Sequence, residues 1–473
     1  AYFEFFYAGQ VDQNKKKIEK FKDKYPQIKK SQIKAIKNLY NLNEVRKKMP
    51  ENSVAVFFSS PIRNRSNSVD FLYHQDRNFY YLTGWREPHG VLLIYKNQQE
   101  DENGFYNERI YVRERDAYRE MWDGKRAGLE GVVRDFDADD AFPIEDLEDI
   151  LPSLLENRAK VYCNLGRYPE FDKEMLGWLS DVRTRKRSGI TVPGELADLG
   201  YFLHELRLFK RAPEIKAMRQ AASVSAAAHC RAMTHCRPGM YEYQIEAELE
   251  YEFRKGGAQY PAYPSIVAGG INACVLHYIE NRARLRKGDL LLIDAGAELN
   301  YYCADITRTF PVSGKFSGRQ RALYDIVLEA QVAAIDKVRA GANFNEPHEA
   351  AVRSIATGLK DLKILKGSLD SIIERGTYRK FFVHRTSHWL GMDVHDVGEY
   401  RLSDDWRLLE PGMVLTVEPG IYVPASKGFP AAWQGIGIRI EDDVLVTRKD
   451  PEVLTHGVPK APDQIEALMA SSH

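Results

Sequence analysis

The sequence predicts two domains, an α/β domain in the first part of the chain and an α+β domain in the second. At 473 residues the chain is longer than one hydrophobic core usually supports. Short β-rich runs alternate with helical stretches up to about residue 165, and long helical patterns followed by hairpins come afterwards. Two similar segments in the second part also end in a carboxylate. We place the domains at residues 1–208 and 209–473.

The composition excludes two classes of partner. Lys+Arg and Asp+Glu both number 67, so the chain has no charge bias toward nucleic acid or membrane surfaces. No run of about 18 apolar residues predicts a transmembrane helix. The five cysteines are widely spaced and form no CxxC motif, which favours a reducing compartment. We expect a cytoplasmic protein, with an exported form that has lost its signal as the alternative.

The first domain is predicted to be small and to follow a Lys-rich extension. Residues 1–50 have a helical pattern and are interpreted as a solvated amphipathic extension, with a docking tail as the alternative. Between residues 52 and 165, short apolar and aromatic runs predict the strands of an α/β domain. These β-rich runs are SVAVFFSS (53–60), NFYYLTG (78–84), GVLLIYK (90–96), RIYVRER (109–115) and KVYCNLG (160–166).

The second domain is predicted to begin with two long helices. A basic, turn-prone segment ends near Pro213, which suits the first turn of a helix with Glu214 behind it. Further helices precede a β-rich region that begins near residue 380. The expected helices are 213–235, 241–256, 318–340 and 346–360.

Two segments of the second domain share one sequence frame. Residues 287–296 are KGDLLLIDAG, residues 411–420 are PGMVLTVEPG, and both fit x-G-x-[LV]-L-x-[IV]-[DE]-x-G. An apolar strand that leads into an acid is costly unless the carboxylate is paired or bound to a metal. Because the pattern occurs twice, it indicates a duplicated half-site that gathers negative charge for a cation.

The first of these segments predicts a hairpin with two facing acids. Residues 288–299 and 301–310 are expected to be strands joined by a tight turn. If Leu299 and Asn300 form the turn, Asp294 and Asp305 lie directly opposite, with Cβ atoms about 5 Å apart. A cation between them would offset their repulsion. The alternatives are a bulge that separates the pair, or one exposed acid and one turn contact.

The second segment predicts an equivalent pair. Glu418 ends an apolar run, and the alternation in GIGIRIEDDVLVT (435–447) places Arg439 and Glu441 on one face of a strand. Glu441 is therefore an acid on a strand that is able to pair with the Glu418 strand. A surface ion pair between Arg439 and Glu441 is the alternative.

Histidines accompany these acids. His384, His388 and His395 fall within twelve residues, and His277 precedes the first hairpin. The helical HExxH zinc motif is absent because residue 385 is Arg, so a loop or strand is expected there. A purely structural role is the alternative for His277.

Four carboxylates and an imidazole predict a two-metal site. A ligand set rich in oxygen suits Mn²⁺ or Mg²⁺. When the set also includes an imidazole, Zn²⁺, Co²⁺ and Fe²⁺ are suitable as well. Four carboxylates are too many for one tetrahedral ion, but they suit two ions about 3.5–4 Å apart with a bridging water. The predicted reaction class is metal-assisted hydrolysis.

The motifs together resemble those of a known family. LHYIEN, LLIDAGAELNYYCADITRTF, TSHWLGMDVHDVG, LEPGMVLTVEPGIY and GIGIRIEDDVLVT occur in the order found in the aminopeptidase P (Xaa-Pro aminopeptidase) branch of the pita-bread metallopeptidases. The resemblance runs from about Ser53 to Met469. It implies a creatinase-like α/β N-terminal domain and an α+β pita-bread catalytic domain with pseudo-twofold halves.

The resemblance also implies the reaction and the residues that perform it. A hydroxide bridging two divalent ions, usually Mn²⁺, would attack the N-terminal Xaa-Pro bond of peptides with proline in the second position. The implied metal ligands are Asp294, Asp305, His388, Glu418 and Glu441, of which Asp305 and Glu441 bridge both ions. The implied catalytic residues are His277, His384, His395, Arg439 and Glu418, with Glu418 as proton carrier, and Tyr422 belongs to the substrate pocket.

Two further features follow from the resemblance. Trp122 matches a tryptophan that reaches a neighbouring subunit's active site in tetrameric members, so we expect a homo-oligomer, either a dimer or a tetramer. Arg385 departs from the family, which often has His-Gly where this chain has His384-Arg385, and it affects the expected peptide length preference. The alternatives are a prolidase-like dipeptidase, an organophosphate ester hydrolase, and a non-catalytic peptide- or histone-binding module. The last is disfavoured because all five ligands are present.

Overall fold

The structure, a computed structural model, describes residues 41–471 except 102–103 and 137. The predicted helical extension at 1–50 lies largely outside the described residues, of which 41–48 are helical. The chain divides into two compact units between Leu203 and His204. The helix α8 (Gly200–Leu208) spans this division and ends at the boundary that the sequence predicts.

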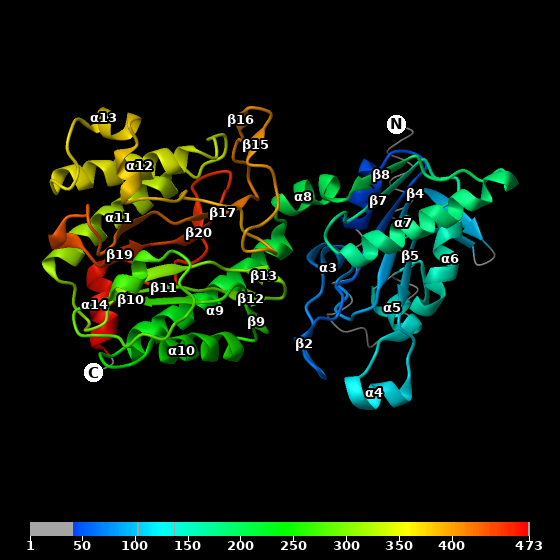
Figure 1. Cartoon of the computed structure of the whole chain (residues 1–473), viewed down its shortest axis with the longest axis horizontal. Helices are drawn as coiled ribbons and strands as arrows, with labels where there is room; N and C mark the ends of the chain where they lie inside the picture. Colours follow the sequence, from blue (N-terminus) through cyan, green and yellow to red (C-terminus); the bar gives the residue numbers. More distant parts are fainter. Residues whose placement is uncertain (1–40, 102–103, 137, 472–473) are drawn as a thin grey trace. The chain divides into compact units, whose positions relative to one another are not determined.

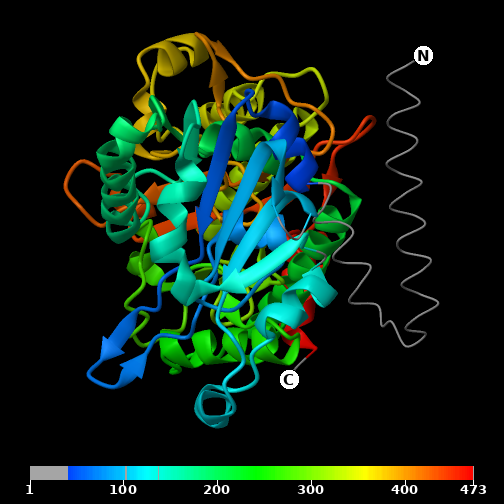
Figure 2. The ribbon, with the colours of Figure 1, turned by 90° about the vertical axis from the view of Figure 1, so that its right-hand side faces the viewer.

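The first unit is built on a mixed six-stranded sheet (Figures 1 and 2). β1 pairs antiparallel with β4 and parallel with β7, so the sheet combines hairpins with crossover connections. Apolar side chains of α6 (Leu147–Leu155) and α7 (Pro169–Thr184) pack with the sheet in one core. In sheet order the strands are β6 (Asp140–Pro143), β5 (Gly104–Val112), β4 (Val91–Asp101), β1 (Ser53–Phe58), β7 (Lys160–Cys163) and β8 (Glu195–Asp198). Outside the sheet lie β2 (Asn64–Ser66), β3 (Val69–Asp70), α4 (Ala117–Asp123) and α5 (Gly128–Phe136).

One expected strand of this unit is a helix. The run NFYYLTG (78–84) was predicted to be β-rich, but it lies in α3 (Arg77–Thr83). The Asp76 carboxylate accepts hydrogen bonds from the N–H groups of Asn78 and Phe79, and Gly84 ends the helix with φ 70°. The prediction was wrong because these two caps outweigh the β propensity of the aromatic residues between them.

The second unit confirms the four predicted helices. α11 ends a few residues earlier than expected, while the other predicted boundaries agree within a residue or two. The helices are α9 (Ala212–His235), α10 (Glu242–Lys255), α11 (Gly318–Asp336), α12 (Glu346–Asp361), α13 (Leu369–Glu374) and α14 (Pro462–Ala470). No helix in the described part of the chain combines the length and hydropathy that a membrane span needs.

Two interrupted hairpins form the β-structure of this unit. In each hairpin, one set of paired residues lies next to the turn and a second set lies farther from it. Both sets follow the same register, and a few unpaired residues, here called the gap, separate them. The first consists of β11 (Leu290–Asp294), β12 (Ala297–Leu299), β13 (Tyr302–Cys303) and β14 (Thr307–Pro311). The second consists of β17 (Val414–Val417), β18 (Gly420–Val423), β19 (Ile436–Arg439) and β20 (Asp442–Leu445).

Three short strands accompany the hairpins, and a two-stranded ribbon lies apart from them. β10 (Ile266–Gly269) pairs with β11, β9 (Tyr260–Pro261) with β12, and β21 (Glu452–Val453) with β20. β15 (Arg401–Leu402) and β16 (Asp405–Trp406) form the ribbon.

The register of the first hairpin differs from the prediction. Asn300 and Tyr301, with φ 52° and 67°, form the turn, so Asp294 pairs with Thr307 rather than with Asp305. The expectation that the two acids face each other directly was therefore wrong. The structure is displaced from the predicted register by two residues, and a two-residue displacement leaves every side chain on its original face. Asp305 consequently still points to the side of the sheet that carries Asp294.

The last glycine of each repeated frame, Gly296 or Gly420, lies at the gap in its hairpin. A Cβ on Gly296 would lie 1.7 Å from the carbonyl oxygen of Ala304 on the opposite strand. A Cβ on Gly420 would lie 2.9 Å from the carbonyl oxygen of Ile438 and 2.7 Å from the Tyr422 hydroxyl. The missing side chains let the strands of each hairpin approach closely where the acids lie.

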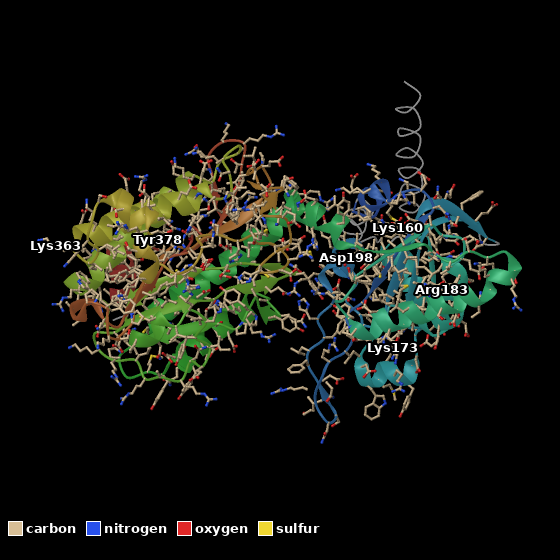
Figure 3. The ribbon with its side chains drawn as sticks, turned by 45° about the horizontal axis from the view of Figure 1, so that its top comes forward. Lys160, Lys173, Arg183, Asp198, Lys363 and Tyr378 are labelled. Atoms are coloured by element: carbon tan, nitrogen blue, oxygen red, sulfur yellow. The ribbon has the colours of Figure 1, made fainter. Side chains whose placement is uncertain are left out.

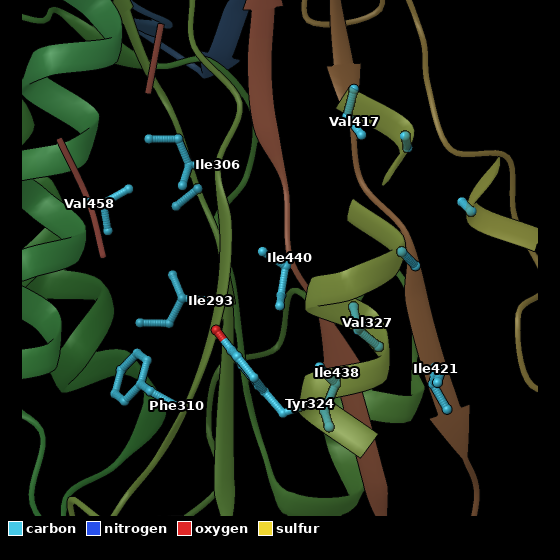
Figure 4. Packing of buried hydrophobic residues seen from close by; sticks show 14 of the residues in the cluster. Ile293, Ile306, Phe310, Tyr324, Val327, Val417, Ile421, Ile438, Ile440 and Val458 are labelled. Atoms are coloured by element: carbon cyan, nitrogen blue, oxygen red, sulfur yellow. The ribbon is translucent and has the colours of Figure 1, made fainter. Parts of the chain in front are cut away.

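The two hairpins share one hydrophobic core with the helices (Figure 4). Side chains of the first hairpin, such as Ile293 and Phe310, and of the second, such as Ile438, belong to a single buried cluster. Tyr324 and Val327 of α11 complete this part of the cluster. The core therefore fixes both hairpins against each other and, with them, the acids at their gaps.

A buried histidine makes the stability of this core depend on pH. His229 of α9 is fully buried, and its Nε2 donates to the carbonyl oxygen of Ala295 at 2.9 Å, while its Nδ1 has no hydrogen-bond partner among the described residues. Burial lowers the pKa of His229 to about 4 from the ordinary 6.5. Between these values the unfolded chain binds a proton that the folded chain does not, so stability falls as the pH drops through this window.

We expect His229→Asn to remove this dependence. The wild type should lose at most about 3 kcal/mol in free energy of unfolding from this group between pH 7 and pH 4. Urea unfolding at both pH values measures the loss, and the variant should show a correspondingly smaller one. An equal loss in both proteins would contradict this role for His229.

Candidate metal centre

Four acids meet at the gaps of the two hairpins. Asp294 ends β11, and Asp305 lies between β13 and β14. Glu418 follows β17, and Glu441 lies between β19 and β20. The register that pairs Val417 with Asp442 also sets Glu418 opposite Glu441. The gaps bring acids from distant parts of the sequence into one buried space.

The geometry of these side chains matches a metal-binding group. Asp305, His388 and Glu441 each offer one ligand atom, and these atoms lie within 4.8 Å of one another. His388 Nε2 is 3.4 Å from Asp305 Oδ2 and 3.7 Å from Glu418 Oε1. Asp294 joins the group through Tyr263, whose hydroxyl contacts both Asp294 and Asp305. All five ligands that the family resemblance implies therefore converge.

His388 is oriented to act as a ligand. It lies in an irregular segment before an isolated bridge between Trp389 and Leu415, in agreement with the expected loop or strand. Its Nδ1 donates to the carbonyl oxygen of Trp389 at 3.0 Å, which leaves the Nε2 lone pair directed at the carboxylates. One imidazole among carboxylates suits a hard or borderline divalent ion, so the residues fit the expected metal pair.

Without a cation the carboxylates repel one another. Burial, followed by the charges of Asp305, Glu418 and Asp294, raises the pKa of Glu441 well above its ordinary value. Burial also raises the pKa of Glu418 to about 8 and that of Asp294 above its ordinary value. A buried group of acids with raised pKa values is stabilised in its charged form by bound cations.

His388 interacts favourably with two of the acids, Asp305 and Glu418. Burial by itself raises the pKa of Asp305, but the hydrogen bond and the charge of His388 lower it below the ordinary value. Burial lowers the pKa of His388, but Asp305 and Glu418 raise it to about 9.

Arg439 connects Asp294 to Thr307 and Tyr422 through hydrogen bonds. It is buried, and it donates to Asp294 Oδ2 at 2.5 Å, to Thr307 Oγ1 at 3.0 Å and to the Tyr422 hydroxyl at 2.9 Å. Thr307 in turn donates to Glu441 Oε2 at 2.6 Å. The alternative of a surface ion pair between Arg439 and Glu441 is therefore wrong.

The other predicted histidines surround this group. His384 Nε2 lies 2.8 Å from the Tyr422 hydroxyl, and its Nδ1 lies 3.8 Å from Glu418 Oε2. Burial, followed by the charge of Arg439, lowers the pKa of His384 to about 3, so this imidazole is neutral.

His395 and His277 are the remaining two histidines. The His395 ring lies 4.4 Å from that of His388, edge to face, and burial lowers the pKa of His395. His277 is exposed, and its charge contributes to the lowered pKa of both His384 and His395. Trp122 belongs to α4 of the first unit, where 72% of its surface is exposed.

Two residues that hold the acids were missed by the sequence analysis. The Tyr263 hydroxyl lies 2.6 Å from Asp294 Oδ1 and also donates to Asp305, so it joins acids from the two sides of the gap. Asp443 accepts the backbone N–H of Asp305 at 3.1 Å. Tyr263 lies in an irregular segment with no repeated frame, so no local signal was available. The alternation that places Asp443 on the face of Glu441 was a weak signal for the second residue.

A buried ion-pair cluster holds the loop that carries His395. The Asp396 carboxylate accepts from Arg207 Nη2 at 2.6 Å and from Lys210 Nζ at 3.0 Å. Arg207 also donates to Asp393 at 2.6 Å. Although burial raises the pKa of Asp396, Lys210 and Arg207 lower it overall. These cations fix the residues on both sides of His395.

Replacing Arg207 with Met is expected to loosen this loop. Because Lys210 still pairs with Asp396, the loss in free energy of unfolding should be about 2 kcal/mol, below the loss for an uncompensated charge. His395 should also be displaced, with kcat lowered about tenfold. Arg219→Met is the matched control, since Arg219 pairs with Glu452 at the exposed surface and should contribute at most about 1 kcal/mol. Equal effects of the two variants in urea unfolding and kinetics would contradict the proposed clamp.

Comparison with known proteins identifies relatives for both units. Residues 216–448 match the model of the family described as metallopeptidase family M24, and residues 40–162 match the model of the aminopeptidase P N-terminal domain. The chain is 43% identical over 424 residues to the Xaa-Pro aminopeptidase of Escherichia coli, covering 90% of this chain and 95% of that protein. It is 32% identical over 420 residues to human Xaa-Pro aminopeptidase 3, covering 88% and 81%.

Solved structures give the same result for the fold. The structure of the aminopeptidase PepP of Pseudomonas aeruginosa aligns with a TM-score of 0.90 at 50% identity, covering 93% of this chain and 98% of that one. Proline aminopeptidase P II of Yersinia pestis aligns with a TM-score of 0.88 at 45% identity, covering 92% and 99%. These findings confirm the predicted fold class. The chain therefore belongs to metallopeptidase family M24 and is a hydrolase of the Xaa-Pro aminopeptidase kind.

Proposed function

We propose that the chain cleaves the N-terminal Xaa-Pro bond of peptides at the five-ligand group between the hairpins. When bound there, two divalent ions would supply a bridging hydroxide as nucleophile and polarise the scissile carbonyl. The observation that supports this best is the convergence of Asp305, His388 and Glu441, with Asp294 and Glu418 alongside.

The metal pair would be held by five side chains. Asp305, His388 and Glu441 offer ligand atoms within 4.8 Å of one another and would hold the ions together with Asp294 and Glu418. Arg439 and Tyr263 hold Asp294 in place by hydrogen bonds, so its orientation does not depend on the metal. Mn²⁺ is the proposed metal, with Zn²⁺, Co²⁺ or Fe²⁺ as alternatives, because the ligand set is rich in oxygen.

Proton transfer is assigned to Glu418. Its carboxylate lies in the ligand group, 3.7 Å from His388 Nε2, where the nucleophile would be held. It would carry the proton toward the departing proline nitrogen. His395 and His277 would donate hydrogen bonds to the oxyanion, and both lie close to the group of ligands.

An aromatic wall provides the proposed preference for proline. The His384 ring lies 5.2 Å from that of Phe382 and 5.5 Å from that of Tyr422. Because a proline nitrogen has no N–H to satisfy, an apolar wall costs nothing there, whereas other residues would lose a hydrogen bond.

The exposed Trp122 would contribute to a neighbouring copy of the site in a dimer or tetramer.

A peptide series tests the proposal. The chain is stripped of metal by chelation and reconstituted with Mn²⁺, Zn²⁺ or Co²⁺, and Xaa-Pro peptides of two to six residues are assayed by mass spectrometry. We expect release of the N-terminal residue only when proline follows it, and no cleavage without metal. Cleavage restricted to dipeptides would favour a prolidase-like activity instead, and cleavage at other bonds would contradict the assignment.

A further inference from the structure

A cavity of about 880 Å³ lies beside the start of α12 and has no role in the site described above. His348 of α12 and Tyr378, which is labelled in Figure 3, contribute to its walls. Its cationic lining residues are Lys337, Arg353, Arg379 and Arg385. Among the described residues, none of these four cations forms an ion pair.

The acids of the cavity are already engaged. Asp336 pairs with Arg339 at 2.6 Å. Glu346 accepts a backbone N–H at 2.9 Å, and Glu349 accepts a hydrogen bond from Asn345 at 2.5 Å. Four cations and three acids line the cavity, and one of the acids, Asp336, is paired with Arg339 outside the lining, so the cavity carries a net positive charge that suits an anion.

Arg385 is held in position at the edge of the cavity. Its guanidinium donates to the Asn345 side-chain oxygen and lies 4.8 Å from the ring centre of Trp406. Burial lowers the pKa of Arg385; the charges of Arg401 and Arg379 act in the same direction, and Tyr378 and Glu349 oppose them. A guanidinium held in this way binds a carboxylate with little further loss of side-chain freedom.

The cavity is adjacent to the proposed proline wall. Phe382 contacts the His384 ring at 5.2 Å and the His348 ring at 5.6 Å, so one phenyl group separates a site histidine from a cavity histidine. Arg385 follows His384 directly in the chain and lines the cavity. At ~3.3 Å per residue, about three residues of extended peptide span the two ring spacings.

We propose that this cavity is a subsite for the part of a longer peptide that follows proline, and that Arg385 and Arg379 bind a carboxylate carried there. The carboxylate is either the C-terminus of a short peptide or an acidic side chain of a longer one. The inference rests on the proposed function, because it assumes that the peptide starts at the five-ligand group. It assigns a positive role to Arg385, where the family often has glycine.

A comparison of three peptides with four forms of the enzyme tests the proposal. The peptides are Ala-Pro-Ala-Ala with a free C-terminus, the same peptide with a C-terminal amide, and the amide with Glu in the fourth position. The enzymes are the metal-loaded wild type, Arg385→Gln and Arg379→Gln. Arg375→Gln is the matched control, because Arg375 is exposed nearby but does not line the cavity.

We expect the wild type to prefer a carboxylate-bearing peptide about tenfold in kcat/KM, through KM, as one charged hydrogen bond would provide. Arg385→Gln should abolish the preference, Arg379→Gln should weaken it, and Arg375→Gln should keep it. A preference for the free C-terminus or for the Glu peptide alone supports the proposal and identifies the source of the carboxylate. Equal rates with all peptides in the wild type, or an unchanged preference in Arg385→Gln, would overturn it.

Calorimetric titration separates this proposal from the proposed function. The same peptides are titrated into the metal-free chain, where no bond is cut. Tighter binding of the carboxylate peptides by the wild type than by Arg385→Gln supports the subsite even when no peptide is cleaved. Equal binding would overturn it, whatever the peptidase assay shows.

Discussion

Replacing His388 with Ala is expected to lower kcat/KM on Xaa-Pro peptides about a thousandfold, the upper range for loss of one electrostatic catalytic group. The variant removes the single imidazole of the ligand group, 3.4 Å from Asp305 and 3.7 Å from Glu418. Because the remaining carboxylates lose both a ligand partner and a charge partner, the metal content per chain should also fall. Elemental analysis after dialysis measures the metal, and peptide kinetics measure the activity.

Asp294→Ala provides a second ligand variant, and His456→Ala is the control. Asp294 is held by Arg439 and Tyr263, so its removal should reduce metal binding without moving the other acids far. His456 is exposed, and its imidazole donates to the carbonyl oxygen of Val453 at 3.0 Å. The assignment is wrong if the wild type binds no metal, or if both ligand variants keep full activity.

Replacing Gly296 with Ala is expected to destabilise the catalytic domain by about 4 kcal/mol or more, or to prevent its folding. The added Cβ would lie 1.7 Å from the carbonyl oxygen of Ala304 and 2.6 Å from the carbonyl carbon. Backbone cannot rotate away as a side chain does, so the two strands must separate at the gap. That separation would also displace Asp305. Urea unfolding measures the stability, and metal content reports the position of the acid.

Two other glycines make this prediction specific. Gly420 occupies the same position in the second repeat, but its nearest backbone oxygen would be 2.9 Å away, so Gly420→Ala should cost less than Gly296→Ala. Gly318 starts α11. Outside its own helix backbone and chain neighbours, a Cβ added to Gly318 would meet no atom of the described residues within 4 Å, so Gly318→Ala should be close to neutral. If Gly296→Ala unfolds at the same urea concentration as Gly318→Ala, the close approach of the strands is not important for stability.

The repeated frame shows how far local pattern extends in this chain. It correctly indicated that Asp294 and Glu418 end equivalent strands, because strand periodicity and the cost of a buried acid are local properties. It did not show that the later acids occupy different registers. Glu441 lies opposite Glu418, whereas Thr307 takes the equivalent place opposite Asp294 and Asp305 lies two residues before it. The pseudo-twofold halves are therefore alike in backbone and different in their acids.

Local pattern also failed where neighbouring residues decide the outcome. The aromatic run at 78–84 has β propensity, but the Asp76 and Gly84 caps make it part of a helix. Tyr263 was not predicted to be a site residue, since only its contacts with Asp294 and Asp305 reveal it. The Arg207 and Lys210 clamp on Asp396 was missed for the same reason, because nearly two hundred residues separate the partners.

The sequence by itself determined four of the helices of the catalytic domain, the duplicated strands, the five proposed ligands and the family resemblance. These follow from residue type and spacing, which act over a few residues, and from long motifs in a fixed order. Only the tertiary structure decided the register of the first hairpin, the hydrogen bonds of Arg439 and Tyr263, and the cavity beside Arg385. Such features depend on which distant segments pack together, and packing is a property of the whole core rather than of any short segment.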